Sequence, residues 1–349
     1  MTTLTFFSHI FFAALQVLLS FSITRYMLRK VAIMDQPNAR SSHSIAVPRA
    51  GGVAIVITFF VGMAAIYFIG DKTHIEQKYM LGFIISSLSI ACISLYDDIY
   101  NKSAQFKLFS QFIAVFFVLW AGIVLDKLAF PIIGYIDLGW AGYIISLLWI
   151  VGLTNACNFM DGLDGLLAGI TVIASLFFMV ISYYGGSPFV YITCYTLLAG
   201  SLGFLLLNFP PAKIFMGDVG STFIGFTFAT LAIIAARYDE SHISFFVIPL
   251  LLFNVIYDVI FTLIRRKLNG ERLTQAHRTH LYQLMNQIGY SHMEVSLTHY
   301  CMAFLQGLGA LWMVQIAGSE RLYVFIPFFL LQIIYTVLII RKAKFKKII

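Results

Sequence analysis

The sequence predicts an all-α, polytopic integral membrane protein, and three observations lead to this fold class. Hydrophobic residues make up 60% of the 349 residues, charged residues only 11%, and the mean hydropathy is +0.87. Soluble globular proteins carry about 25% charged residues. Apolar runs long enough to cross about 30 Å of hydrocarbon recur along the whole chain. The stretches between them are too short for a soluble domain, so we expect a single transmembrane domain over residues 1–349.

We expect about eleven transmembrane helices, one for each apolar run. The first run has no basic residue before it and no cleavage-site pattern after it, which predicts a retained span and not a signal peptide. Segment 128–140 alternates polar and apolar residues around Gly134 and predicts a small hairpin between two spans. The runs lie at about residues 5–24, 50–70, 79–95, 107–125, 141–157, 165–183, 188–208, 219–236, 243–264, 295–317 and 322–340.

The basic residues predict the orientation of the spans. With the N-terminus outside, 18 of the 23 Lys and Arg residues fall on the cytoplasmic side, as the positive-inside rule requires. An odd number of spans then puts the C-terminus in the cytoplasm. The net charge of +7 is mostly this asymmetry, and the basic C-terminus is expected to meet anionic membrane lipids. No nucleic-acid partner is predicted.

Acidic residues gather where apolar runs end, on the face predicted to be cytoplasmic. Asp97 and Asp98 follow the third run, and Asp218 precedes the eighth. A charge at the edge of hydrocarbon is costly unless it is paired or binds an ion, so the clustering indicates a site on the cytoplasmic face. Adjacent residues on a helix point about 100° apart, so Asp97 and Asp98 are not expected to hold one ion in the same way. The alternative is an acidic helix end balanced by Lys102.

Segment 155–165, between the fifth and sixth runs, holds four polar side chains and two glycines. Asp161 and Asp164 share one face if this segment is helical. Oxygen-rich clusters of this kind suit Mg²⁺, whose coordination is completed by water and substrate phosphates. The alternative is a glycine-rich turn capped by Asp. The four polar residues are Asn155, Asn158, Asp161 and Asp164.

Asp218, flanked by glycine at position 217, opens the eighth run. It is either a helix N-cap or a metal-binding carboxylate beside the positive end of a helix, where a diphosphate is also favoured. These two interpretations are compatible with each other.

Segment 265–283 gathers cations and two histidines on the same face. His277 and His280 have no third ligand at zinc spacing, so we expect hydrogen bonds or a positive contact to a phosphate. Asp258 lies about two turns inside the preceding span, and Arg265 or Arg266 is its expected partner. The two glutamates near this segment, Glu271 and Glu294, are expected to be solvated.

Read together, these motifs resemble the polyprenyl-phosphate N-acetylhexosamine-1-phosphate transferases of glycosyltransferase family 4. The motifs stand in the family's order across about residues 35 to 285. They are Asp35 to His43 with Pro48 to Gly52, then Asp97-Asp98, Asn155 to Gly165, Asn208 to Ser221, and segment 265–283.

The resemblance implies a catalytic membrane domain with a defined reaction. The phosphate of polyprenyl (undecaprenyl) phosphate attacks the β-phosphorus of a UDP-N-acetylhexosamine, UMP leaves, and a sugar remains joined to the lipid by a diphosphate. A phosphate monoester is mostly a dianion at neutral pH, so a strong general base is not required. The implied setting is a bacterial inner membrane, with Mg²⁺ or Mn²⁺ as the cofactor.

The resemblance also implies roles for single residues. Asp218, with Asn158, holds the metal, and Asp97 and Asp98 lie beside the lipid phosphate. Asp161 and His280 match positions near the diphosphate. The nucleotide pocket is formed by Asn158, Asp164, Asn208, Phe215, which stacks on uracil, and Arg278.

One departure from the family pattern bears on the sugar. Many relatives carry a His-x-His run in the last motif, whereas His280 is followed here by Leu281, Tyr282 and Gln283. This change favours the branch that starts O-antigen or another cell-envelope glycan with GlcNAc or a deoxy relative such as FucNAc or QuiNAc. The peptidoglycan-precursor phospho-sugar translocase of the same family is the alternative. The polyprenol length, a direct or two-step mechanism, and the oligomeric state, a homodimer included, are left open.

A secondary transporter or lipid flippase is the rival from a different class. Transporter sites lie near the bilayer midplane on broken helices, whereas the acids here, apart from Asp258, gather at one surface. This distribution is typical of an interfacial enzyme that takes a lipid from the membrane and a nucleotide sugar from the cytosol.

Overall fold

The computed structural model describes residues 3–30, 33–35, 46–69, 76–237, 243–272 and 277–349. Most of the first motif, residues 36–45 with Arg40 and His43, therefore lies outside the described residues. The elements in chain order are α1 (Thr3–Lys30), β1 (Met34–Asp35), β2 (Val47–Pro48), α2 (Gly52–Ile69), α3 (Gln77–Tyr100), α4 (Ala104–Trp120), β3 (Lys127–Phe130), β4 (Gly134–Asp137), α5 (Ala141–Met160), α6 (Leu166–Gly185), α7 (Pro188–Asn208), α8 (Asp218–Arg237), α9 (Val247–Leu251), α10 (Phe253–Leu268), α11 (Leu281–Gln287), α12 (His292–Met313), the 3-10 helix η1 (Gly318–Val324) and α13 (Phe325–Phe345).

The helical, polytopic membrane architecture is confirmed. Among the described residues, seven helical segments are long and apolar enough to cross a membrane, and α2 and α4 are shorter apolar helices. Every expected apolar run coincides with a helix. The run at 243–264 differs from expectation, because it is broken at Leu252 into α9 and α10. The short helix α11 was not expected, although its start carries a capping box between His280 and Gln283.

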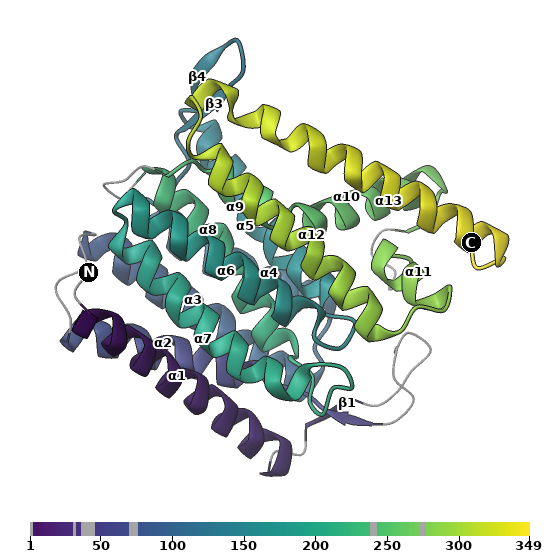
Figure 1. Ribbon diagram of the computed structural model, residues 1–349, viewed down its shortest axis with the longest axis horizontal. Coiled ribbons are helices and arrows are strands. Elements are labelled where there is room, and N and C mark those ends of the chain that lie inside the picture. Colours follow the sequence, from purple (N-terminus) through teal and green to yellow (C-terminus); the bar gives the residue numbers. More distant parts are fainter. Residues whose placement is uncertain (1–2, 31–32, 36–45, 70–75, 238–242, 273–276) are drawn as a thin grey trace.

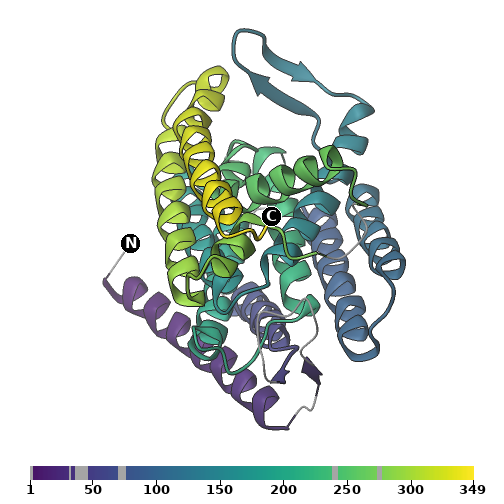
Figure 2. The same ribbon diagram turned by 90° about the vertical axis from the view of Figure 1, so that its right-hand side faces the viewer.

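Two small antiparallel sheets accompany the helices. Strands β3 and β4 form the expected hairpin, with Phe130 opposite Gly134. Strands β1 and β2 pair through Met34 and Pro48. Figures 1 and 2 show the β3–β4 hairpin standing out at one end of the helix bundle. In Figure 1, β1 and α11 lie at the opposite end.

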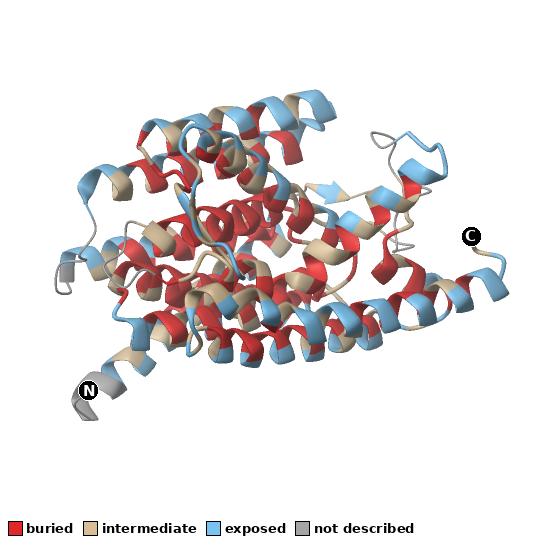
Figure 3. Ribbon diagram, turned by 90° about the horizontal axis from the view of Figure 1, so that it is seen from above, coloured by how far each residue is buried: buried red, intermediate tan, exposed pale blue. Residues whose placement is uncertain are grey.

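Helix α8 forms the centre of the bundle. It packs against α3 and α5, and almost all its residues are buried, as the red ribbon of Figure 3 shows for the inner helices. α2 also packs on α8, where a Cβ on Gly52 would lie 2.4 Å from the Cα of Gly220. Only glycine allows such a close backbone approach. α1 and α13 carry many exposed large apolar side chains, as expected of helices that face lipid.

Candidate active site

The site is built around the first turn of α8. A helix start leaves backbone N–H groups without helical partners. Asp98, at the end of α3, accepts from two of them: the N–H of Asp218 at 3.1 Å and that of Val219 at 2.9 Å. One turn further along, the hydroxyls of Ser94 and Thr222 are hydrogen-bonded at 2.8 Å. These contacts fix the end of α3 against the start of α8.

The backbone around Pro48 joins the same assembly. The N–H of Phe215 donates to the carbonyl of Pro48 at 2.8 Å, and the N–H of Gly51 donates to the carbonyl of Phe215 at 2.9 Å. The Arg49 side chain donates to the carbonyl of Asp98 and to Oδ1 of Asn101. Three motifs that are distant in sequence therefore meet at one place.

Asp97 and Asp98 face different partners, as expected from adjacent helical positions. Asp97 is almost buried and forms an ion pair with Lys107 at 2.8 Å. The same ammonium group contacts the Asp218 carboxylate, so Lys107 bridges two acids. The expected balancing residue, Lys102, contributes its backbone N–H to Asp97, while its ammonium lies over the rings of Tyr96 and Tyr100.

Asp218 is the first residue of α8, and its carboxylate is about a quarter exposed. The helix start is capped by Asp98 and not by Asp218 itself. The N-cap interpretation of Asp218 therefore leaves its side chain unexplained, whereas its contact with Lys107 turns the carboxylate toward the other acids.

The acidic turn after α5 does not have the helical form that would place two acids on one face. α5 ends at Met160, and Asp161 has a non-helical backbone conformation. The turn reverses at Gly165, whose φ of +71° favours glycine. The segment forms a glycine-containing turn after α5, and its expected role as a Mg²⁺ site stays a prediction.

Asp161 is partly buried and lies among acids of its own charge. Its pKa is raised well above the ordinary value by burial and then by the negative charges of Asp218, Asp98 and Asp164. No hydrogen bond or ion pair from a described residue reaches its carboxylate. The acidic turn and the start of α8 therefore share one electrostatic site, in which ionisation of Asp161 is disfavoured by the neighbouring acids.

Asp164 and Asn208 connect loops of the site. Asp164 accepts from the N–H of Ala212 at 3.0 Å and pairs with His292 at 3.1 Å. Asn208 accepts from the N–H of Gly165 at 3.1 Å and donates to the carbonyl of Ile214 at 2.9 Å. Both side chains hold the 208–217 loop against the acidic turn, and their expected contact with a nucleotide stays a prediction.

The remaining residues expected at the nucleotide pocket lie around this assembly. Phe215 is only partly buried, which leaves part of its ring open for stacking. Asn158 is also partly buried, on the last turn of α5. The carbonyl of Arg278 accepts from the side chain of Gln287 at 2.6 Å. Their roles toward a ligand stay predictions as well.

Asp258 belongs to a second polar cluster, in which its hydrogen bonds do not come from the expected arginines. It accepts from His280 Nδ1 at 3.1 Å and from the backbone N–H groups of Leu281 at 2.9 Å and Tyr282 at 3.0 Å. Of the expected arginine partners, Arg265 interacts with Asp258 through its charge. The hydrogen bonds to this carboxylate come instead from the start of α11, which presents two N–H groups and a histidine.

The expected arginine partners and glutamates form hydrogen bonds and ion pairs elsewhere. Arg266 forms an ion pair with Glu271 at 2.8 Å, and Arg265 donates to the carbonyl of Thr279. Glu294 completes a capping box with Ser291 at the start of α12. The two glutamates are therefore specific structural partners as well as solvated groups.

Tyr282 joins the second cluster to the acidic turn. Its hydroxyl donates to the carbonyl of Phe159 at 2.7 Å, and a Cβ on Gly162 would lie 2.2 Å from that hydroxyl oxygen. The ring is fully buried. The residue that departs from the family's histidine pattern thus holds α11 against the turn that carries Asp161.

His277 is a hydrogen-bonded neutral group at neutral pH. Burial and then the neighbouring charges of His280 and Arg266 lower its pKa to about 4. Its Nδ1 lies 3.1 Å from the hydroxyl of Thr279, and its ring stacks on that of His280 with centroids 4.9 Å apart. Of the two expectations for His277, hydrogen bonding fits this environment, and a positive contact to a phosphate stays a prediction.

The side chains of the site include oxygen donors for a divalent cation. Among the described residues, no three His, Cys, Asp or Glu side chains stand together as a preformed metal centre. Mg²⁺ does not need one, because it usually binds one or two carboxylates, waters and substrate phosphates. The carboxylate of Asp218 and the unpaired, destabilised carboxylate of Asp161 fit this requirement.

Sequence reasoning missed four residues that assemble the site. Lys107 was counted only as a topology signal, Arg49 was included in a family motif without a role of its own, and His292 was not singled out. Tyr282 was noted only as a departure from the family pattern. A possible signal for Lys107 is its position in the first turn of the helix that follows the Asp97-Asp98 pair. Contacts such as the one between Asp164 and His292 join residues 128 positions apart, and the sequence alone gives no signal for them.

The model of the family described as Glycosyl transferase family 4 matches residues 80–236. The chain is 33% identical over 335 residues, 95% of this chain and 92% of the relative, to the probable undecaprenyl-phosphate N-acetylglucosaminyl 1-phosphate transferase of Bacillus subtilis strain 168. It is 29% identical over 314 residues, 82% of this chain and 77% of the relative, to the decaprenyl-phosphate N-acetylglucosaminephosphotransferase of Mycobacterium tuberculosis strain H37Rv. A phospho-N-acetylmuramoyl-pentapeptide-transferase of Listeria monocytogenes strain EGD-e is 50% identical over 99 residues, 28% of this chain and 31% of that relative.

Proposed function

The chain belongs to glycosyl transferase family 4 and is a phospho-sugar transferase, and on this premise we propose that it transfers N-acetylhexosamine 1-phosphate from a UDP-sugar to polyprenyl phosphate. UMP and a lipid-linked diphosphosugar are the products. Family membership places the chain among enzymes, against the transporter and flippase alternatives.

One observation carries the proposal. Asp97, Asp98, Asp161 and Asp218 converge at the start of α8, and of these Asp161 has no partner among the described residues. Natural proteins rarely leave buried acids together without compensation unless a ligand supplies it. A cation held between these acids and a diphosphate is the ligand that matches the charge.

The residues of the site have different roles in the proposed reaction. The reaction brings a phosphate dianion to a diphosphate, so repulsion between anions is the main barrier. Lys107 is a cation beside the positive end of α8, and both favour the negative charge that develops on the departing UMP oxygen. Asp97 holds Lys107, and Asp98 holds the helix start. Both acids therefore act as positioning groups, and neither is needed as a strong base.

The proposed cofactor is Mg²⁺, with Mn²⁺ as the substitute. Asp218, Asp161 and Asn158 are the residues that would hold it. When bound, the cation neutralises phosphate charge and polarises the phosphoryl group. Asp161 must lose its proton to be a ligand, and its raised pKa makes this step dependent on pH.

The topology of the proposed enzyme follows the positive-inside rule. We place eleven spans in a bacterial inner membrane, with the N-terminus outside and the C-terminus and the active site on the cytoplasmic side. The opposite positions of the β3–β4 hairpin and of β1 and α11 in Figure 1 support two distinct membrane faces. A UDP-sugar would then arrive from the cytosol and the lipid phosphate from the bilayer.

GlcNAc is the proposed sugar, with FucNAc or QuiNAc as deoxy relatives. Two relatives that align with more than three quarters of this chain carry N-acetylglucosamine in their names. The name that includes muramoyl-pentapeptide belongs to a relative aligned over 28% of this chain. We propose that this reaction is the first step in the synthesis of O-antigen or of another cell-envelope glycan.

The test is UMP release from purified protein with Mg²⁺, undecaprenyl phosphate and a panel of UDP-N-acetylhexosamines. We expect release with UDP-GlcNAc and none without the lipid. Asp218→Asn should lower the rate about 10²–10³-fold, because a ligand that stabilises transition-state charge is removed. Asp137→Asn, the same substitution in the exposed β4 strand, is the matched control and should keep the full rate. No UMP release with any donor would contradict the proposed function, and a normal rate in Asp218→Asn would contradict the metal role.

A further inference from the structure

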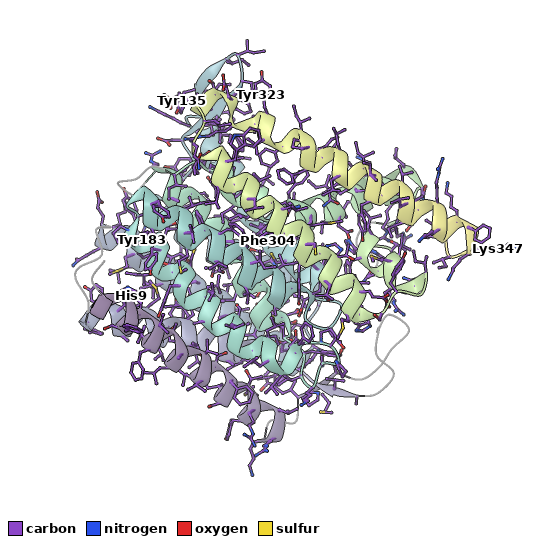
Figure 4. The ribbon with its side chains drawn as sticks, viewed as in Figure 1. His9, Tyr135, Tyr183, Phe304, Tyr323 and Lys347 are labelled. Atoms are coloured by element: carbon purple, nitrogen blue, oxygen red, sulfur yellow. The ribbon has the colours of Figure 1, made fainter. Side chains whose placement is uncertain are left out.

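A cavity of about 400 Å³ lies at the end of the bundle that carries the β3–β4 hairpin. It is enclosed by the segment from Leu125 to Ala129, the last residues of α8, the residues before α9, and Arg321 of η1. Figure 4 shows Tyr135 of β4, which lines this cavity, and Tyr323 of η1 together at this end of the molecule. The hairpin and η1 are in contact.

This cavity is separate from the candidate active site. Asp218 begins α8 at the candidate site, and Arg237 ends the same helix at the cavity. A helix of 20 residues is about 30 Å long, which is the thickness of the hydrocarbon core. The two sites therefore lie at opposite membrane faces, and one ligand cannot reach both.

The charged lining of the cavity is mostly positive. Lys127, Arg237 and Arg321 contribute cations, and Asp126 is the carboxylate in the lining. Asp126 forms an ion pair with Arg237. Nε of Arg321 is buried and has no hydrogen-bond partner among the described residues. A buried guanidinium donor without a partner is costly, so this donor indicates an acceptor that a ligand would supply.

Most of the remaining lining is apolar and includes Leu125, Phe245 and Phe246. A cavity with an arginine donor beside apolar walls, at the level of a membrane interface, suits an amphiphile with an anionic head. Guanidinium groups match the geometry of phosphate oxygens. We propose that this cavity binds the headgroup of an anionic phospholipid from the leaflet opposite the candidate active site, with its phosphodiester at Arg321. This inference goes beyond the proposed transferase function and does not depend on it.

The experiment measures lipid binding to the purified full-length protein by native mass spectrometry in detergent. Phosphatidylglycerol, phosphatidylcholine and inorganic phosphate are titrated separately. We expect the wild type to bind phosphatidylglycerol in preference to phosphatidylcholine. Arg321→Gln should weaken phosphatidylglycerol binding about tenfold, the effect of losing one charge-assisted contact.

Lys78→Gln is the matched control, because it removes one exposed cation at the start of α3, outside this cavity. It should bind phosphatidylglycerol like the wild type. An unchanged thermal midpoint in Arg321→Gln shows that the variant is folded. Equal binding in Arg321→Gln and the wild type, or an equal loss in Lys78→Gln, would overturn the proposal. Binding of inorganic phosphate that depends on Arg321, without binding of phosphatidylglycerol, would assign a soluble anion and overturn the lipid proposal.

Discussion

Asp161 and Asp258 are both acids next to apolar helices, and their surroundings are opposite. Asp258 is fully buried and accepts from two backbone N–H groups, the His280 ring and the hydroxyl of Thr262. Asp161 receives no hydrogen bond from a described residue, and the charges that act on it are those of other acids. The fold supplies hydrogen-bond donors to the carboxylate of Asp258, and the described residues supply none to that of Asp161.

This difference separates a structural acid from a ligand-binding acid better than burial or sequence position does. A buried charge with several donors rigidifies its surroundings, and removing it leaves those donors unpaired. A carboxylate that lies next to other carboxylates destabilises the fold until a cation binds between them. The two clusters are nevertheless coupled, because Tyr282 donates to Phe159 next to the acidic turn while its own N–H is held by Asp258.

The largest expected effect is that of replacing Asp161. Asp161→Asn should lower the rate of UMP release about 10²–10³-fold, since a carboxylate that balances the cation is lost. The thermal midpoint should stay the same or rise, because repulsion from Asp218, Asp98 and Asp164 is relieved. UMP release and thermal unfolding of the same preparation check both parts. A variant that keeps its rate, or loses stability, would place Asp161 with the structural acids.

The next effect concerns Asp258. Asp258→Asn should destabilise the protein by about 2–3 kcal/mol, because an amide replaces a charged acceptor in front of several buried donors. A lowered thermal midpoint is the expected measurement. The exposed Asp137→Asn variant is the control and should unfold like the wild type. An unchanged midpoint together with a complete loss of UMP release would reverse the roles assigned to the two acids.

The smallest expected effect is the dependence of Mg²⁺ binding on the protonation of Asp161. The pKa of Asp161 is raised, so this acid stays protonated to a higher pH than an ordinary carboxyl, and Mg²⁺ requires the ionised form. Mg²⁺ affinity should therefore increase with pH, by at most about tenfold per pH unit for one released proton. The rise in thermal midpoint caused by Mg²⁺ measures this from about pH 5 to about pH 8. Asp161→Asn should lose the pH dependence, and an equal dependence in that variant would assign it to another group.

The sequence predicted most of the helical architecture, and the roles it predicted for the site residues stay predictions. Composition and the lengths of the apolar runs are local properties, so the helices and the β3–β4 hairpin could be located without tertiary information. The break at Leu252 was not predicted, although Pro249 inside the run is a signal for a helix break. Helix α11 was also missed, because it is short and its capping box was not recognised.

The sequence by itself determined which acids stand at the ends of helices, because this follows from the order of apolar and charged residues. Only the tertiary structure decided which acids are satisfied. Lys107 bridges Asp97 and Asp218, and Asp98 caps α8 from 120 residues away. Hydrogen bonds depend on distances of a few ångströms between distant segments, and these distances are set by how the helices pack.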